Sequence, residues 1–300
     1  MAMPSMSRSE LPKVTESVAS SRVLTIVGCG YVGTAVARQL QSRRQDHPLV
    51  LTTTREERRL DLTALADRVQ ICDATNPEQL EAALTDSSAA VFCLGPKGNR
   101  QVDADGYRTT FLDSFNCLKA VMPALPGLGQ IVYTSSCSVY GHAADDWVDE
   151  TTPASPRPGH GDVLLESEQR VMSLSSERTQ VCVLRLGALH GPGREITTRL
   201  RSLAGQDQPG DGQSFSNWVH VDDAAGAVVA AIDGRWSGVV NVVNDEPIRL
   251  RDLVDTTLRQ QALEPVRWSG RQTHTPCSRR IRNDRLKELG YELHHPTVFL

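Results

Sequence analysis

Short apolar runs alternate with amphipathic stretches along most of this chain. The runs have the length of buried strands and are rich in β-branched residues, whereas the stretches between them repeat their apolar positions with the period of a helix. The expected strands are Val23 to Val27, Leu49 to Thr53, Val69 to Cys72, Ala90 to Leu94, Gln130 to Thr134 and Val181 to Leu186. The expected helices are Val32 to Gln41, a weaker one within Glu56 to Leu65, Pro77 to Leu84, a long one from Asp103 to Ala124, and Asp162 to Leu174. Because strands joined by crossover helices make parallel sheets, the pattern predicts an α/β fold with a doubly wound parallel sheet.

The pattern loosens after Gly187, where the glycine-rich segments GPG and GQDQPGDGQ replace the regular periods. It resumes from Val221 to Ile232 and from Val239 to Val243, and a helix from Leu250 to Gln260 follows. We interpret this part as a smaller lobe that is interleaved with the end of the sheet. The predicted divisions are a disordered tail at 1–21, a sheet domain at 22–186, and a smaller substrate lobe at 187–300 from which about 218–243 returns to the sheet domain.

Composition excludes several classes of partner. With a formal net charge of −4, the chain has no basic field that would hold nucleic acid or an anionic membrane surface. No apolar run reaches the roughly 18 residues of a membrane span. The seven cysteines are odd in number, lie far apart and form no CxxC pair, so we expect reduced core residues in a cytoplasmic protein and no metal site. The serine-rich tail lacks the hydrophobic core of a secretory signal, and Glu10 and Glu16 are unusual in a transit peptide.

The segment VLTIVGCGYVGTAVARQL carries a GxGxxG motif, formed by Gly28, Gly30 and Gly33, between the first strand and the first helix. In this position the motif predicts a Rossmann dinucleotide-binding turn. The first glycine permits the tight turn, the second lets a pyrophosphate approach the backbone, and the third lets the helix pack closely on the strand. Tyr31 and Val32 begin the helix, so we expect their amides to face the anion.

The end of the second strand reads TTTR and bears on the choice of cofactor. An NAD site usually has an acid here for the ribose hydroxyls, whereas the 2′-phosphate of NADP needs small polar groups and an arginine. Thr53, Thr54 and Arg55 therefore predict NADP in preference to NAD. Two alternatives stay open: Glu56 and Glu57 could turn toward the ribose, and Arg55 could be a plain surface charge.

Three other polar residues near these strand ends have two interpretations each. Arg58 and Arg59 could add to the phosphate site, but they fit an exposed helix face better. Asp73 ends the third strand, where it should face the adenine of a cofactor. Alternatively, Asp73 is the N-cap of the helix that begins near Pro77.

A family resemblance rests on segments that follow one another in a specific order, namely GCGYVG, TTTR, CDAT, VFCLGP, YTSSCSVYG, RLGALHGPGR, NWVHVDDAAGAV and NVVNDEP. Over almost everything after the tail, the chain resembles an extended or atypical short-chain dehydrogenase/reductase of the NAD-dependent epimerase/dehydratase kind. The resemblance implies a Rossmann domain with a small C-terminal substrate lobe and a nicotinamide cofactor across the sheet edge. It places Asp73 at the adenine, Leu94 and Gly95 under the ribose, and Ser136 near the reacting centre. It also implies a homodimer paired through the long helix and the helix that opens at His160.

The chain departs from this family at two positions that normally carry the chemistry. Members have Tyr and Lys where this sequence has His160 and Leu164, counted in step with the ESEQ that follows. The tyrosine exchanges a proton with the substrate oxygen while hydride moves, and the lysine lowers the tyrosine pKa and holds the ribose. Leu164 can do neither, so the family's catalytic roles cannot be transferred to these two positions.

Other side chains are candidates for the missing proton transfer. An imidazole titrates close to neutral pH in general, so His160 could act as an acid or base, or it could be only a polar residue at a helix entrance. Tyr140 and His190 are further titratable candidates with structural roles as their alternatives. Ser136 can hydrogen-bond a substrate oxygen whatever supplies the proton. Asp222 and Asp223 resemble a helix cap and its first-turn neighbour, and we assign them no chemistry.

The sequence therefore predicts an NADP-dependent oxidoreductase that acts on a carbonyl or alcohol of a small polar metabolite, with sugar nucleotides as one possible class. An alternative is a catalytically silent protein that binds NADPH and changes shape or partner with the cofactor ratio. Loss of both Tyr and Lys favours the alternative, and the retained SSCSVYG segment favours the enzyme. The substrate is not encoded in any side-chain pattern of the smaller lobe.

Overall fold

The computed structural model describes residues 23–43, 47–96, 103–271 and 277–299. Its centre is a seven-stranded parallel sheet with the order β12-β7-β5-β4-β1-β2-β3. Its strands are β1 (Val23–Val27), β2 (Leu49–Thr53), β3 (Arg68–Ile71), β4 (Ser87–Phe92), β5 (Gln130–Ser136), β7 (Gln180–Leu186) and β12 (Gly238–Val242). The order reverses between β1 and β4, as in Rossmann folds, which confirms the predicted doubly wound sheet.

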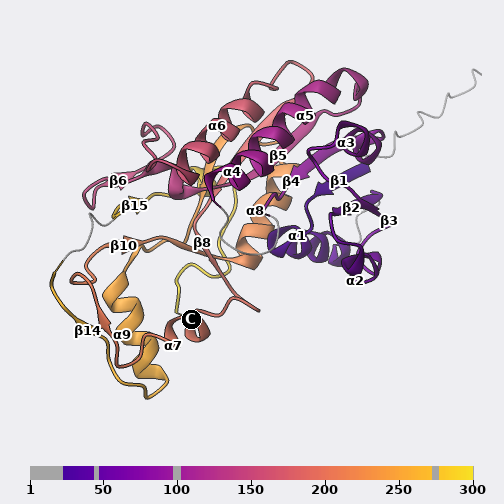
Figure 1. The fold of residues 1–300 in the computed structure, drawn as a ribbon. Coiled ribbons are helices and arrows are strands. Elements are labelled where there is room, and N and C mark those ends of the chain that lie inside the picture. Colours follow the sequence, from indigo (N-terminus) through magenta and orange to yellow (C-terminus); the bar gives the residue numbers. More distant parts are fainter. Residues whose placement is uncertain (1–22, 44–46, 97–102, 272–276, 300) are drawn as a thin grey trace, which may run out of the picture.

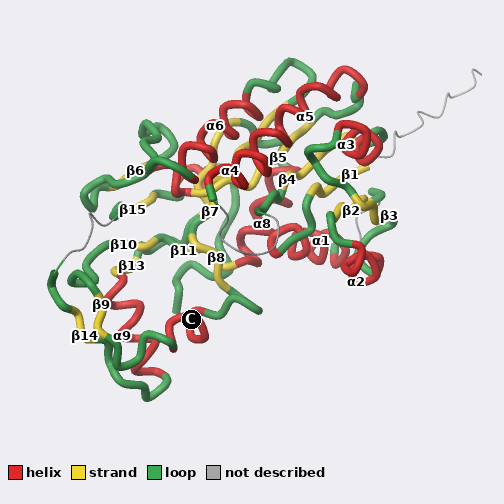
Figure 2. The backbone as a smooth tube through the Cα atoms, in the orientation of Figure 1, coloured by secondary structure: helices red, strands yellow, loops and turns green. Residues whose placement is uncertain are grey.

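Helices cover both faces of the sheet (Figures 1 and 2). On one face lie α1 (Tyr31–Ser42) and α8 (Val221–Asp233), and on the other lie α3 (Pro77–Leu84), α5 (Ser114–Val121) and α6 (His160–Met172). Alternate strand residues point to opposite faces, as the pleat requires, so Ile26 and Val27 belong to different apolar clusters. Both side chains are almost fully buried, which explains why the strands read as continuous apolar runs.

The helix expected from Asp103 to Ala124 is divided into several segments. It consists of α4 (Ala104–Tyr107), a π-helical turn η2 (Arg108–Asp113), α5, and a 3₁₀ turn η3 (Met122–Ala124). A π-helical turn inserts an extra residue per turn and is common at functional sites. The prediction of one continuous helix was therefore wrong in detail, because periodicity does not register a single wide turn.

Two further boundaries differ from the predictions. The weak helix within Glu56 to Leu65 is a 3₁₀ turn η1 (Glu56–Arg58) followed by the short α2 (Arg59–Thr63). Helix α6 begins at His160 rather than Asp162, because Gly159 takes the left-handed conformation with φ of 102° and the Asp162 carboxylate accepts the Gly159 amide at 3.1 Å. His160 thus stands in the first turn of the helix.

A smaller lobe follows the sheet and has a core of its own. Its core side chains include Trp218, Leu253 and Leu258. Its helices are α7 (Ile196–Arg201) and α9 (Leu250–Gln260), and its short strands are β9 (Asp207–Gln208), β10 (Phe215–Ser216), β13 (Ile248–Arg249) and β14 (Arg267–Trp268). The remaining elements are η4 (Cys137–Tyr140), β6 (Trp147–Val148), β8 (Ala188–His190), β11 (Trp218–His220), β15 (Arg280–Ile281) and α10 (Asp284–Glu288). Between β11 and β13 the chain returns to the sheet through α8 and β12.

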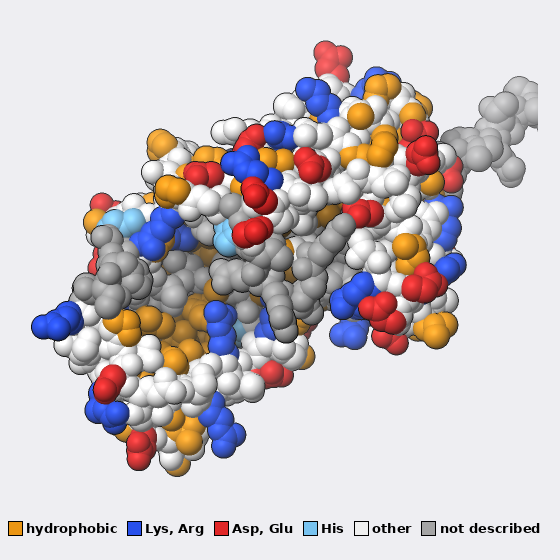
Figure 3. Space-filling view, viewed as in Figure 1, with side chains coloured by type: hydrophobic (Ala, Val, Ile, Leu, Met, Phe, Trp, Pro, Cys, Tyr) orange, Lys and Arg blue, Asp and Glu red, His pale blue; other side chains and the backbone are white. Residues whose placement is uncertain are grey.

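The molecule is hollowed between the sheet domain and the smaller lobe, and hydrophobic side chains are exposed over the lobe with Lys and Arg at the margin (Figure 3). Among the described residues, no helix is both long and apolar enough to cross a membrane. The pairing of two chains that the family resemblance implies stays a prediction.

Candidate functional site

A cleft of about 1830 Å³ runs along the carboxyl ends of the parallel strands. Sites for one drug-sized ligand are usually about 300–1,000 Å³, so this cleft has room for a dinucleotide and a second small molecule. It lies where the strand order reverses, which is the usual ligand position in open α/β sheets. The predicted site residues that line it are Gly28, Gly30, Tyr31, Val32, Thr53, Thr54, Arg55, Asp73, Leu94, Gly95, Ser136 and His160.

The three fingerprint glycines occupy three different environments. Gly28 has φ of 89°, and a Cβ atom on it would lie 2.7 Å from the Cys93 carbonyl oxygen. A Cβ on Gly33 would lie 2.7 Å from the Gly28 carbonyl oxygen, so this residue permits the close approach of α1 to the turn. A Cβ on Gly30 would meet nothing within 4 Å, because this residue faces the open cleft. The arrangement matches what a pyrophosphate-binding turn requires of each position.

The end of β2 presents cations and hydroxyls to the cleft and no acid. Arg55 lines the cleft, and its amide donates to Thr53 Oγ1 at 3.2 Å. Glu56 pairs with Arg59 at 3.3 Å and Glu57 lies 4.0 Å from Arg55, and neither glutamate lines the cleft. The alternative in which a glutamate turns toward the ribose has no support in this geometry.

Arg58 is a half-buried cation that the sequence analysis placed on an exposed helix face. Its guanidinium donates to the Cys29 carbonyl oxygen and, at 3.2 Å, to Thr34 Oγ1, so it lies against the fingerprint turn and lines the cleft. The short 3₁₀ turn η1 is what brings Arg58 back toward β1. Arg59, the next residue, points away to Glu56 and lies outside the cleft lining.

Asp73 lines the cleft beyond the end of β3 without capping a helix. Its Oδ1 accepts from the amide of Thr75 at 3.1 Å and from the Thr75 hydroxyl at 2.8 Å, which makes a local turn. The N-cap of α3 is Asn76, whose side chain accepts from the Gln79 amide at 3.1 Å. The capping interpretation of Asp73 was therefore wrong.

Serines end β5 at the middle of the cleft. Ser136 Oγ accepts the Ser138 amide at 3.1 Å and so caps the turn η4 while still lining the cleft. Ser135 donates to the buried Glu168 carboxylate at 2.6 Å, and Glu168 pairs with the buried Arg185 at 2.7 Å. The Glu168–Arg185 pair therefore holds the end of β5 in place through the Ser135 hydroxyl.

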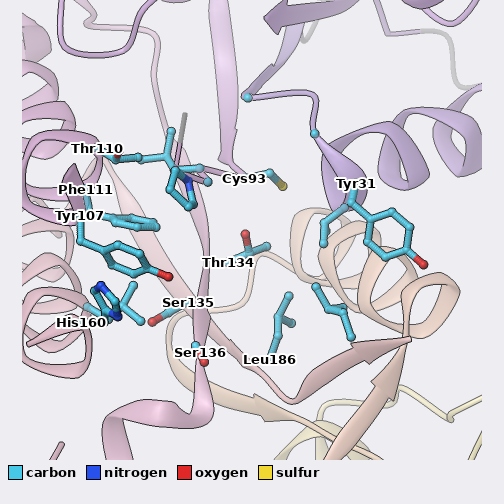
Figure 4. Close-up of a pocket in the computed structure, with 18 of the residues that line it drawn as sticks. Tyr31, Cys93, Tyr107, Thr110, Phe111, Thr134, Ser135, Ser136, His160 and Leu186 are labelled. Atoms are coloured by element: carbon cyan, nitrogen blue, oxygen red, sulfur yellow. The ribbon is translucent and has the colours of Figure 1, made fainter. Parts of the chain in front are cut away.

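Tyr107 and His160 form a stacked pair over the serines, with ring centroids 4.1 Å apart and planes inclined by 30°. Figure 4 shows the Tyr107 hydroxyl directed toward Ser135, with His160 beside the phenol ring. Burial raises the pKa of Tyr107, so its phenol stays protonated at neutral pH. The sequence analysis missed Tyr107 because nothing in the pattern marks a residue at the start of a π-helical turn.

Helix α6 supplies His160 and, one turn later, the buried Leu164, and both line the cleft. No tyrosine or lysine occurs within α6, whose sequence is HGDVLLESEQRVM. The side chains that face the middle of the cleft from this helix are therefore an imidazole and an aliphatic group.

Comparison with known proteins identifies the family of the chain. The model of the NAD dependent epimerase/dehydratase family matches residues 24–243. The chain belongs to that family. It is accordingly an NAD(P)-dependent enzyme, as the resemblance implied.

Individual relatives differ in how much of the chain they match. A 3-diazoavenalumate denitrifying reductase from a Streptomyces species is 36% identical over 108 residues, which are 33% of this chain and 36% of that protein. A dTDP-4-dehydro-6-deoxy-D-allose reductase from a Streptomyces species is 25% identical over 264 residues, 78% of this chain and 79% of that one. The structure of dTDP-glucose 4,6-dehydratase from Bacillus anthracis in complex with NAD has a TM-score of 0.75 and 16% identity, covering 92% of this chain and 95% of that chain.

Two candidates from the sequence lie away from the cleft of this family member. Tyr140 is buried and donates to Asn241 Oδ1 at 2.8 Å, with the Arg185 guanidinium 4.7 Å from its ring, and burial raises its pKa to about 12. His190 is also buried and packs against Trp218. Neither is among the described residues that line the cleft, so their position supports structural roles.

The charge of the cleft is one-sided. Six arginines and two acids line it among the described residues. The arginines are Arg55, Arg58, Arg157, Arg194, Arg199 and Arg279, and the acids are Asp73 and Glu195. A cleft with this excess of cations attracts anionic ligands.

Proposed function

We propose that the chain is an NADP-dependent reductase that acts on a carbonyl group of a small anionic metabolite, with nucleotide sugars as the first class to test. The observation that carries the proposal is the arginine-rich lining of the cleft. Bound NADPH would supply the hydride. The residues of the chain bind and orient the two molecules and deliver a proton to the substrate oxygen.

The choice of NADP rests on the two arginines at the end of β2. Arg55 is exposed and has the exposed Glu57, 4.0 Å away, beside its guanidinium. Arg58 is held against the fingerprint turn by the Cys29 carbonyl oxygen and Thr34. A 2′-phosphate between them would receive charge-assisted hydrogen bonds, which are worth roughly 1.5–3 kcal/mol each. Among the residues that the structure describes, no acid lines this part of the cleft to hold the 2′-hydroxyl of NAD.

The substrate end offers two arginines whose planes are held by aromatic rings. Arg194 lies 4.3 Å from the Tyr31 ring centre and Arg199 lies 5.7 Å from that of Trp218. Both side chains are exposed to the cleft, whereas Arg279 is committed to the carbonyl oxygens of Gly141 and Cys137. Preorganised guanidinium groups suit a diphosphate or a carboxylate, because they bind two oxygens at once.

The proton comes from Tyr107 in this proposal. Its hydroxyl is directed toward the end of β5, where Ser136 can hold the substrate oxygen (Figure 4). The raised pKa keeps the phenol protonated, which suits donation to an alkoxide that forms during reduction. His160 stacks on the ring and holds it in this orientation.

A second candidate reaction follows from the relative that is 36% identical over 108 residues, a denitrifying reductase of 3-diazoavenalumate. Replacement of a diazonium group by hydride forms a C–H bond, breaks the C–N bond and releases N₂. That reaction needs no proton from the enzyme, which fits a helix α6 without tyrosine or lysine. The arginines would then bind the carboxylate of an aromatic diazo compound.

Turnover measurements separate these candidates. Purified chain is mixed with NADPH and, in parallel, with keto forms of dTDP- and UDP-linked sugars and with a carboxylated aromatic diazo compound, and NADPH oxidation is followed optically. We expect turnover with a member of one class. Arg199→Ala should raise KM for that substrate by about tenfold or more and leave NADPH affinity unchanged, since one charge-assisted pair is lost. Arg201→Ala, on the same helix but outside the cleft lining, is the matched control.

Firm NADPH binding without oxidation of NADPH by any member of the panel would contradict the reductase and favour the silent NADPH-binding protein. Equal effects of Arg199→Ala and Arg201→Ala on KM would remove the assignment of the substrate end.

A further inference from the structure

Three histidines and two aspartates gather where the smaller lobe joins the sheet domain, outside the cleft lining. His190 ends β8, and His220 ends the neighbouring β11. Asp222 and Asp223 lie in the first turn of α8, and His295 comes from the C-terminal segment. Segments far apart in the sequence thus bring five polar side chains to one place.

Two of the imidazoles and one carboxylate lie close enough to share an ion, and the third imidazole lies beside them. Ligating atoms of His220, Asp222 and His295 are all within 4.8 Å of one another. The His220 and His295 rings lie 3.8 Å apart, and the His190 ring lies 5.1 Å from His220. Bonds of about 2.0–2.1 Å from a tetrahedral Zn²⁺ to its ligands put neighbouring ligand atoms roughly 3.3 Å apart, so modest side-chain rotation closes the set.

His190 contributes a buried ring nitrogen without a hydrogen-bond partner among the described residues. The side chain is 8% exposed, and its Nε2 has no hydrogen-bond partner in the part of the chain that the structure describes. An unpaired buried polar atom costs roughly 1–3 kcal/mol, so a native protein rarely leaves one without a partner.

Asp223 stands behind His295 in the position of an outer-shell carboxylate. It is fully buried, and its Oδ2 lies 3.0 Å from His295 Nδ1. Its oxygens also accept from the amides of His294 and His295 and from the Tyr291 hydroxyl. Metal-binding histidines usually donate their second ring nitrogen to such a carboxylate, which leaves Nε2 with its lone pair for the ion.

We propose that His190, His220, Asp222 and His295 bind one divalent cation of borderline softness, for which Zn²⁺ is the natural probe. Imidazole and carboxylate donors suit this class of ion, and four such donors complete a tetrahedral set. No metal site was predicted from the sequence, because the four ligands are scattered between residues 190 and 295 and form no spacing motif. The site does not depend on the proposed oxidoreductase activity.

Binding at this site would order one wall of the cleft. Arg194 follows His190 by four residues, and its guanidinium lies over Tyr31 in the cofactor turn. An ion that ties β8 to α8 and to the C-terminal segment therefore fixes the turn that carries Arg194. Because the ion ties these segments together, its binding can be measured through the melting temperature without any assay of catalysis.

The test uses the full chain after removal of metals with a chelator. Calorimetric titration with Zn²⁺ should show one ion per chain with micromolar or tighter affinity, and Zn²⁺ should raise the melting temperature. Co²⁺ in place of Zn²⁺ should give the visible absorption of a four-coordinate site. His295→Ala and Asp222→Asn should weaken Zn²⁺ binding by about tenfold or more, as loss of a ligand does.

Two choices of variant keep the result clear. Asp222 is exposed, so Asp222→Asn tests the site without disturbing the core, whereas substitution of the buried His190 can also unfold the chain. His47→Ala replaces an exposed histidine elsewhere and is the matched control. Failure of wild type to bind Zn²⁺ or Co²⁺ at about 100 μM, or equal binding by the Asp222→Asn, His295→Ala and His47→Ala proteins, would overturn the proposal.

Discussion

At the scale of single residues, we propose that Tyr107 replaces the catalytic tyrosine that α6 lacks. Tyr107 comes from a different helix, but its hydroxyl is directed toward the same strand end (Figure 4). No lysine lowers its pKa, and burial raises it instead. A phenol that stays protonated near neutral pH can donate a proton, whereas almost no phenolate is present to accept one, so this site suits reduction better than alcohol oxidation.

The first prediction concerns Tyr107→Phe. Removal of the hydroxyl keeps the stack on His160 but removes the proton donor, so turnover in carbonyl reduction should fall about a hundred to ten thousandfold with NADPH affinity little changed. Because the acid form of a group with a raised pKa persists to higher pH, the wild-type rate should stay level through the range in which an ordinary tyrosine titrates and fall only above it. Tyr140→Phe, which removes a buried phenol outside the cleft, is the control and should leave the pH profile unaltered.

His160 variants distinguish donation from positioning. His160→Phe preserves an aromatic partner for Tyr107, whereas His160→Ala does not. We expect His160→Ala to be slow and His160→Phe to recover much of the rate. A wild-type rate in Tyr107→Phe together with a severe loss in both His160 variants would assign the proton to His160 instead.

At the scale of elements, the boundaries of β1, β2, α3 and α9 agree with the sequence pattern, because apolar runs and flanking turn residues mark them clearly. The π-helical turn η2 and the 3₁₀ turn η1 were not predictable in this way. Both are short departures from helical period, and each positions one residue that the sequence analysis undervalued, Tyr107 and Arg58. The dinucleotide-binding turn could be predicted from the sequence, because its geometry requires glycines at fixed spacings within six consecutive residues.

The fingerprint turn gives a matched pair of substitutions. Gly30→Val adds atoms on the open side of the turn, so the chain should fold as wild type and lose NADPH binding. Gly33→Ala places a Cβ atom 2.7 Å from the Gly28 carbonyl oxygen, so it should lower the melting temperature. Thermal unfolding and cofactor titration of both variants check this. NADPH binding by a folded Gly30→Val protein would show that the phosphates bind elsewhere.

At the scale of the whole molecule, parallel strands bring their carboxyl ends to one edge, so residues from Gly28 to Arg279 meet in a single cleft. The sequence could predict which strand ends contribute, because each has its own polar signal. It could not predict how the smaller lobe closes the cleft, since Arg194 and Arg199 have no periodic or motif context. Their position depends on the packing of α7 in the core of the smaller lobe and on the aromatic rings beneath them.

Burial across the molecule also predicts thiol reactivity. Six cysteines are buried, and the pKa values of Cys29, Cys72, Cys93, Cys137 and Cys182 are raised by burial to about 12. Cys277 alone is partly exposed, and it lines the cleft. Because the thiolate is the reactive form, the native protein should react quickly with a disulfide reagent at Cys277 only, and Cys277→Ser should abolish that reaction. Fast labelling of two or more thiols would contradict the packing described here.

The central claim is that this cleft is an NADP(H) site, and calorimetric titration of NADPH and NADH tests it most directly. We expect NADPH to bind one per chain and at least about tenfold more tightly than NADH, because a charge-assisted pair on the 2′-phosphate is worth roughly 1.5–3 kcal/mol. Arg58→Ala should remove most of that preference by weakening NADPH alone, and Arg55→Ala should act in the same direction. Arg59→Ala, which alters the neighbouring arginine outside the cleft, should keep it. Equal or tighter binding of NADH to wild type, or the same loss in Arg58→Ala and Arg59→Ala, would contradict the claim.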